Sequence, residues 1–355
     1  MSKSKGNVID PLHIIDGVEL QVLIDELYSG NIKDSEISTY EAKKREDFPN
    51  GIPPCGTDAL RFGLLSYLSQ HRNINLDVAR IVGYRQFCNK IWNAVRFAIS
   101  KFDQHFVAPN AAEFVQSKDF KDHATFADRW ILSRLNNAIT SCHTHNPIYE
   151  FYQSTDAVFQ FFTRELCDVY LELIKGIFRD TNATKQQHIT SNILYLCVDL
   201  SLKLMHPFMP FVTEELWQRL PGSRSTRDSL IVQSYPTPFS DWTNAAVEKE
   251  MNLVLNVIKN LRSHKQTHLN LPTKTIYDIS ICTTIPFILE TVERHKPAIQ
   301  TLAMTGNISV ANTDVHNDSI YNTWSLAEHQ IIIDEQTLKY VSYHNVSGLE
   351  KKKEN

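Results

Sequence analysis

The sequence of 355 residues lacks the features that would assign several common protein classes. Its six cysteines form no Cys-x-x-Cys pair, so neither a zinc knuckle nor a redox pair is indicated, and no metal site is predicted. No apolar run reaches membrane-spanning length and no signal peptide opens the chain, so we expect a cytoplasmic protein without a membrane partner. The net charge of -4 gives no bulk attraction to nucleic acid, so any RNA contact requires a local patch.

The composition that remains is globular, with 42% hydrophobic and 21% charged residues. Residues 1–56 mix short apolar runs with a charged segment and a proline-rich turn, which predicts a linker with little regular core. Residues 57–243 carry helical periodicity and end in a loop, residues 244–340 alternate helix and strand patterns, and residues 341–355 form a charged tail. The predicted fold is therefore mainly α, with an antiparallel helix bundle followed by a small α/β unit.

Several helix boundaries can be predicted from local signals. Asp77 is a candidate N-cap, proline stops a helix at His206-Pro207, and Pro210 suits a first helical turn. The apolar residues predicted to face inward on the helix that follows Asp77 are Val78, Ile81, Cys88, Ile91, Val95 and Phe102. Those of a helix predicted over residues 149–177 are Phe151, Thr155, Val158, Phe162, Leu166, Val169 and Leu173. A further helix is predicted over residues 287–302, with strands near 276–281, 307–311 and 330–334.

A polar stripe follows the helix that starts after Asp77. It consists of Arg85, Asn89, Asn93 and Arg96, at steps of four, four and three residues. Such a face could contact RNA phosphates and bases. The pattern alone is more typical of a solvated helix face, and this alternative stays open.

The chain opens with Ser2, Lys3 and Ser4, followed by Lys5-Gly6-Asn7. Hydroxyl donors, ammonium groups and a glycine suit a mobile clamp for a polyphosphate. A lysine placed at the leaving pyrophosphate of ATP would stabilise the transition state more than the ground state. The alternative is a solvated N-terminal segment without function.

Cys142, His143 and His145 resemble metal ligands only superficially. No partner pair of ligands occurs elsewhere, so ordinary surface histidines are the better interpretation.

Longer motifs extend these observations. The segments that carry the resemblance run from Met1 to Pro11, from Gly56 to Gly63, from Gly83 to Asn93 and from His206 to Trp217. The first resembles the Lys-Met-Ser-Lys-Ser loop of class I aminoacyl-tRNA synthetases. Together they resemble the C-terminal part of valyl-tRNA synthetases of the eukaryotic cytosolic type, and the run Phe-Cys-Asn-Lys-x-Trp-Asn favours valine over isoleucine and leucine.

The resemblance implies an enzyme that activates valine with ATP and Mg²⁺ and transfers it to tRNA-Val. Lys3 would be the catalytic contact to ATP, with Ser2 and Ser4 beside it in the ATP-binding loop. The helix bundle would be the anticodon-binding domain. The residues expected to contact tRNA are Arg85, Asn89, Lys90, Asn93 and Arg96.

The sequence also departs from that family. It contains no His-x-Gly-His element, and the segments expected for the nucleotide-binding half, the amino-acid pocket and the editing domain are missing. His71 stands where a glycine is usual, and Val169 where many members have tryptophan. We therefore expect this chain alone to be inactive. A stand-alone tRNA-binding module without catalysis, or a helical scaffold, remain the alternatives.

Overall fold

The computed structural model describes residues 9–29, 32–67, 76–222, 228–267, 272, 275–276, 278–282, 285–311, 321–326 and 329–334. Within this part the chain is mainly helical, as predicted. It divides into two compact units. The first unit comprises residues 1–124, 134–168 and 184–243, and the second comprises residues 125–133, 169–183 and 244–355.

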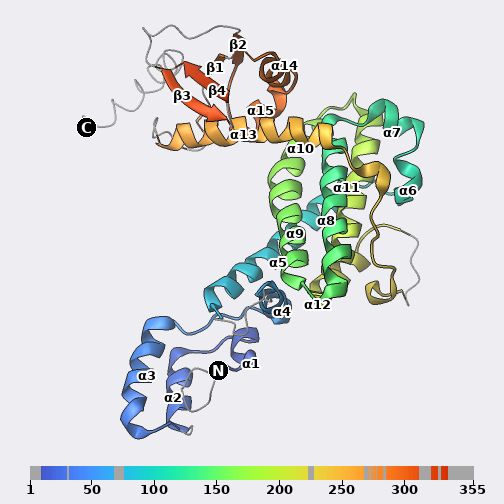
Figure 1. Cartoon of the computed structure of the whole chain (residues 1–355). Coiled ribbons are helices and arrows are strands. Elements are labelled where there is room, and N and C mark those ends of the chain that lie inside the picture. The colour runs from blue at the N-terminus through green and yellow to red at the C-terminus, as the bar shows by residue number, and fades with distance from the viewer. Residues whose placement is uncertain are drawn as a thin grey trace, which may run out of the picture. The chain divides into compact units, whose positions relative to one another are not determined.

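The N-terminal segment has more regular structure than a linker. It forms α1 (Pro11–Ile15), α2 (Leu20–Ser29) and α3 (Asp34–Asp47), and α2 and α3 lie side by side (Figure 1). Ile14, Leu23 and Ile52 are almost fully buried. The expectation of little regular core was wrong, because apolar residues three and four positions apart give α2 one buried face that outweighs the polar residues around it.

The helix bundle of the first unit packs around an aromatic cluster. Phe62 on α4 (Thr57–Ser66) contacts Tyr84 and Phe87 on α5 (Val78–Ile99), at ring-centroid distances of 5.0 and 5.4 Å. A Cβ at Gly63 would overlap Ile81 Cδ1, so the missing side chain lets α4 and α5 approach closely.

Further helices follow α5 in the first unit, and α8 (Phe126–His145) begins in the second unit and continues in the first. Helix α8 connects through the short turn η2 (Asn146–Ile148) to α9 (Phe151–Gln160), so these two helices are antiparallel. Helix α11 (Thr184–Met205) packs beside α9 and α12 (Pro210–Gln218) (Figure 1). Shorter elements complete the unit: α6 (Ala111–Phe114), α7 (Lys118–His123), η4 (Leu230–Val232) and η5 (Ser240–Trp242).

The helix predicted over residues 149–177 is interrupted by a different helical form. Between α9 and α10 (Leu171–Arg179) lies a π-helix, η3 (Phe161–Tyr170). A π-helix bonds i to i+5 and so changes which residues share a face. The predicted inward residues from Thr155 to Val169 are buried and Phe151 is partly buried. In α10 the buried positions are Leu171 and Ile174, and the prediction for Leu173, which is partly exposed, was wrong.

The predicted helix boundaries are confirmed in the bundle. The Asp77 carboxylate caps α5 by accepting from the N–H of Ala79 at 2.9 Å. Helix α11 ends at Met205, and α12 has Pro210 as its first residue. Helix α5 itself ends at Ile99, so Phe102 was wrongly placed on it; its ring instead packs on Phe106 in the following turn.

Asp58 of α4 holds the start of α12 in place. Its carboxylate accepts from the N–H groups of Phe211 and Val212 at 3.2 and 2.7 Å. Two donors that have no partner inside α12 are thereby satisfied by a residue more than 150 positions earlier in the chain.

The second unit contains the predicted α/β structure. It includes α13 (Ala245–Thr267), β1 (Ile279–Cys282), α14 (Pro286–Arg294), α15 (Lys296–Ala303), β2 (Ile308–Ala311), β3 (Tyr321–Leu326) and β4 (His329–Asp334). The sheet has the order β2-β1-β4-β3, with β1 and β2 parallel and the other pairs antiparallel (Figure 1). The helix predicted over 287–302 is two helices, because Pro297 has no N–H to continue the first.

Candidate nucleic-acid interface

The predicted ATP-phosphate loop lies outside the described residues. Ser2, Lys3 and Ser4 belong to residues 1–8, so their roles stay predictions. The geometry that can be followed is that of the predicted tRNA contacts on α5.

Helix α5 has one buried and one exposed face. Ile81, Ile91 and Val95 are completely buried, and full burial of such a side chain stabilises a fold by about 1.5–3 kcal/mol. The opposite side presents the stripe of Arg85, Asn89, Asn93 and Arg96, all four of which are exposed. We call these four residues the α5 stripe.

A side-chain hydrogen bond to the helix backbone orients one amide of the α5 stripe. The Nδ2 of Asn93 donates to the backbone carbonyl of Asn89 at 2.9 Å. This bond fixes the amide of Asn93 and leaves its Oδ1 as an acceptor on the exposed side. The two arginines bracket the amides, so the stripe offers cations at its ends and amide groups between them.

Lys90 lies beside the stripe and is already engaged. Its Nζ is 2.7 Å from the carboxylate of Asp168 and also donates to the carbonyl of Thr163 at 3.5 Å. The side chains of Lys90 and Asp168 are 39% and 49% exposed, and an ion pair of that kind contributes only ~0–1 kcal/mol. An RNA phosphate could therefore replace the aspartate at small cost.

Trp92 is an exposed aromatic residue that sequence reasoning missed. It lies three residues after Asn89 and four before Arg96, on the edge of the stripe, and the residue is 38% exposed. The guanidinium of Arg219 from α12 lies 5.3 Å from its ring centre, and Arg219 is itself paired with Glu215. The available signal was an aromatic residue at helical spacing from two polar stripe positions.

Cys142 and His145 near the end of α8 make contacts within the protein. Cys142 is fully buried, and burial raises the pKa of its thiol to about 11. One ring nitrogen of His145, Nδ1, is 2.7 Å from the carbonyl of Ser141 one turn earlier. Cys142 is therefore a neutral thiol near pH 7, and its Sγ donates to the carbonyl of Ser154 at 3.8 Å.

Comparison with known proteins gives two family matches. Residues 1–77 match the family described as tRNA synthetases class I (I, L, M and V), and residues 128–277 match the anticodon-binding domain of tRNA ligase. The α5 stripe lies between these two matched segments. The matches therefore say nothing about its residues one by one.

Similar relatives include valine--tRNA ligases. The protein of Mus musculus is 45% identical over 265 residues, covering 74% of this chain and 20% of the mouse protein. The mitochondrial 1 protein of Arabidopsis thaliana is 39% identical over 326 residues, covering 89% of this chain and 28% of the plant protein. The chain therefore spans roughly a fifth to just over a quarter of these relatives.

With its two matched segments and these identities, the chain belongs to the class I tRNA synthetases, in the valine--tRNA ligase family. The helix bundle includes most of the segment that matches the anticodon-binding domain. In the part of the chain that the structure describes, every helix is too short or too polar to cross a membrane.

Proposed function

We propose that this chain supplies the tRNA-binding part and the ATP-phosphate loop of a valine--tRNA ligase, which attaches valine to tRNA-Val at the expense of ATP. The observation that carries the proposal is the exposed α5 stripe on a helix of the bundle whose later part matches the anticodon-binding domain. The relatives are named for valine and tRNA and their class uses ATP, which supports valine, tRNA and ATP as substrates.

The stripe suits an unstacked RNA loop by its chemistry. Arginines at its ends can pair with phosphates, and the amides of Asn89 and Asn93 can bond to the edges of splayed bases. The exposed ring of Trp92 offers a face on which a base can stack, and Lys90 can add a phosphate contact once Asp168 is displaced. The overall charge of -4 confines attraction to this local surface.

The ATP half of the proposal concerns residues 1–8. ATP supplies the adenylate that activates valine, and Mg²⁺ is expected to accompany its phosphates. Lys3 would stabilise the negative charge that develops on the leaving pyrophosphate, and Ser2 and Ser4 would donate hydrogen bonds to the phosphate oxygens. Binding of valine and of the ATP base requires further protein surface, so we expect the isolated chain to lack activation activity.

A binding titration tests the tRNA proposal. Wild-type protein should bind tRNA-Val more tightly than a tRNA with an exchanged anticodon. The Arg85→Ala/Arg96→Ala variant should lose roughly tenfold in affinity per arginine, and its salt dependence should fall by a slope of about 0.7 per lost contact. The matched control is Lys118→Ala/Lys121→Ala, which removes two exposed cations from α7.

The same titration separates the alternatives. Equal affinity of wild type and stripe variant for both RNAs would make the stripe a solvated helix face and favour the scaffold.

Catalysis is tested by valine-dependent exchange between ATP and pyrophosphate, where activity clearly above background would refute the expected inactivity. A cytoplasmic location is also part of the proposal. Because the similar Arabidopsis protein is named as mitochondrial, this part needs a localisation experiment of its own.

A further inference from the structure

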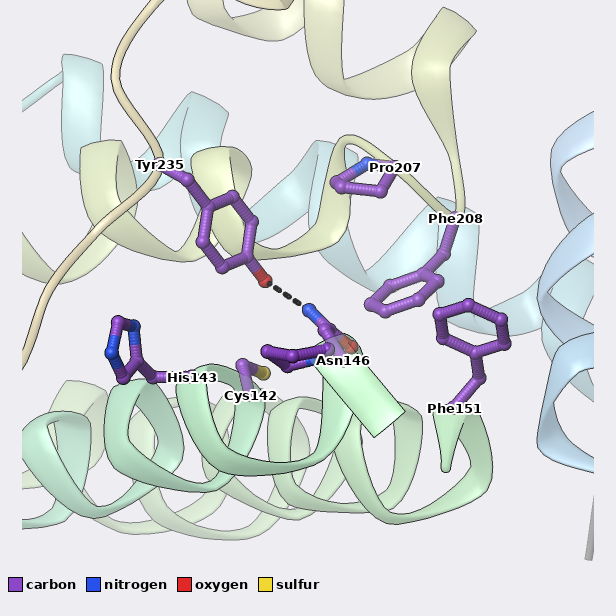
Figure 2. Close-up of a pocket in the computed structure, with 8 residues that line it drawn as sticks. Cys142, His143, Asn146, Phe151, Pro207, Phe208 and Tyr235 are labelled. Atoms are coloured by element: carbon purple, nitrogen blue, oxygen red, sulfur yellow. Dashed lines mark hydrogen bonds between the residues drawn. The ribbon is translucent and has the colours of Figure 1, made fainter. Parts of the chain in front are cut away.

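A pocket away from the α5 stripe is lined almost entirely by apolar and aromatic groups. It has a volume of about 310 Å³ and lies in the first unit, where the turn between α8 and α9 meets the segment after α11. Asn146 lies between Tyr235 on one side and Phe151 and Phe208 on the other (Figure 2). A pocket of this size, with aromatic walls and one amide, is typical of a site for a planar ligand.

The amide of Asn146 has a defined orientation in this pocket. Its Nδ2 donates to the hydroxyl of Tyr235 at 3.1 Å (Figure 2). Tyr235 donates in turn to the carbonyl of Leu204 at 3.3 Å. The Oδ1 of Asn146 is buried and has no partner among the residues that the structure describes. A buried acceptor without a donor is uncommon in a folded protein and indicates that a bound group supplies one.

A second pocket adjoins the first. It has a volume of about 520 Å³, and Pro207 and Tyr235 line both pockets. Its walls are more polar than those of the aromatic pocket. The polar side chains that line it include Thr57, Arg61, Lys203, His206, Gln233 and Ser234.

His206 brings a second buried acceptor to this pair of pockets. The hydroxyl of Thr213 donates to the carbonyl of Met209 at 2.7 Å, so it must accept from Nδ1 of His206, which is 2.8 Å away. The proton is therefore on Nδ1, and burial lowers the pKa of His206, so the ring is neutral at pH 7. Its Nε2 has a free lone pair and no partner in the described part of the chain, although the side chain is only 9% exposed.

Positive charge accompanies this acceptor. Arg61 donates through Nη2 to the carbonyl of Pro207 at 3.0 Å, which uses one of its five N–H donors and holds it at the pocket. Lys203 is held there by Asp199, 2.6 Å from its Nζ. A ligand of this pocket should combine an O–H donor for His206 with an anionic group near Arg61.

We propose that the two adjoining pockets together hold one unstacked nucleotide of an RNA chain. The base would pack against the aromatic side chains that line the first pocket and donate an N–H to Asn146 Oδ1. The ribose 2′-hydroxyl would donate to His206 Nε2, and the phosphate would pair with Arg61. The proposal rests on the RNA partner of the proposed function but uses a surface other than the α5 stripe.

The first experiment compares two probes on the full chain. They are a single-stranded RNA hexamer of adenosines and the DNA hexamer of the same sequence, titrated under one salt condition. Because only RNA has the 2′-hydroxyl, we expect RNA to bind roughly tenfold more tightly than DNA. Equal affinity of the two hexamers would overturn the proposal, and so would adenosine monophosphate binding as tightly as the RNA hexamer, which would indicate a site for a free nucleotide.

Two variants locate the site. Ser234→Trp adds a large side chain to the exposed wall of the second pocket and should weaken RNA binding at least tenfold, by filling the space proposed for the ribose and phosphate. Val232→Trp is the matched control, since Val232 is exposed in the same segment and lines neither pocket, and it should bind as wild type does. RNA binding by Ser234→Trp at the wild-type affinity would refute the site.

A further variant tests the hydroxyl contact. His206→Asn keeps an N–H donor for Thr213 but removes Nε2, so it should bind RNA and DNA equally. If it fails to fold, the comparison of the two hexamers on the wild type still decides. The Arg85→Ala/Arg96→Ala variant should still bind the RNA hexamer, and adding Ser234→Trp to it should abolish that binding. This result would show that the pockets bind RNA even if the α5 stripe does not bind tRNA.

Discussion

Replacement of Asp128 by alanine should strongly destabilise the second unit. Thr125 and Asp128 form a capping box at the start of α8: the carboxylate of Asp128 accepts from the backbone N–H of Thr125 at 2.9 Å and from its hydroxyl at 2.7 Å. The hydroxyl of Thr125 accepts in return from the N–H of Asp128 at 3.1 Å. The same carboxylate accepts from the hydroxyl of Tyr170 at 2.6 Å, and both side chains are completely buried.

The magnitude follows from these contacts. Loss of a helix cap costs about 0.5–2 kcal/mol, and removing the buried acceptor of the Tyr170 hydroxyl costs about 1–3 kcal/mol. The sum is about 3 kcal/mol for Asp128→Ala, which should lower the urea midpoint by about 1 M or more. Tyr170→Phe leaves the cap intact but deprives the buried Asp128 carboxylate of one donor, so it should cost about 1–3 kcal/mol.

Urea unfolding followed by circular dichroism measures these values. Two compact units can unfold separately, so both transitions should be fitted, and the transition of the second unit, which contains Thr125, Asp128 and Tyr170, should shift. Asp122→Ala, an exposed aspartate on α7, is the control and should stay within about 0.5 kcal/mol of wild type. The reasoning is refuted if Asp128→Ala costs less than 1 kcal/mol by this assay, or if the double variant with Tyr170→Phe shows purely additive losses.

Three further predictions concern the first unit. Gly63→Ala should destabilise it by about 1–3 kcal/mol, because the new methyl group overlaps Ile81 Cδ1, and Ile81→Val should recover part of that loss in thermal unfolding. Burial lowers the pKa of His206 in the folded protein. As the pH falls below about 6.5, His206 is therefore protonated in the unfolded chain before it is protonated in the folded protein, and the free energy of unfolding should decrease. The drop in Tm between pH 7 and 5.5 should be smaller in His206→Asn, and an identical drop would contradict the argument. Asp168→Asn should release Lys90 and raise tRNA-Val affinity about two- to threefold at low salt; an unchanged or weaker affinity would remove Lys90 from the interface.

The sequence alone determined the features that depend on neighbouring residues. The start of α5 at Asp77, the end of α11 before His206-Pro207 and the start of α12 at Pro210 follow from capping and from the missing N–H of proline. The exposure of the α5 stripe follows from helical periodicity, which needs only the spacing of apolar residues. The family resemblance was also available at this level, because it depends on short motifs rather than on contacts.

Other features were decided only by tertiary structure. The π-helical stretch that turns Leu173 partly outward cannot be distinguished from an α-helix by spacing, since it follows from packing on both sides. Sequence order likewise gives no sign that Asp58 satisfies the first donors of α12. The same holds for Tyr235, which reaches Asn146 across the bundle and, with Pro207, joins two pockets. These contacts link residues far apart in the chain, and local pattern fixes which face of a helix is apolar but not which distant side chain comes to cover it.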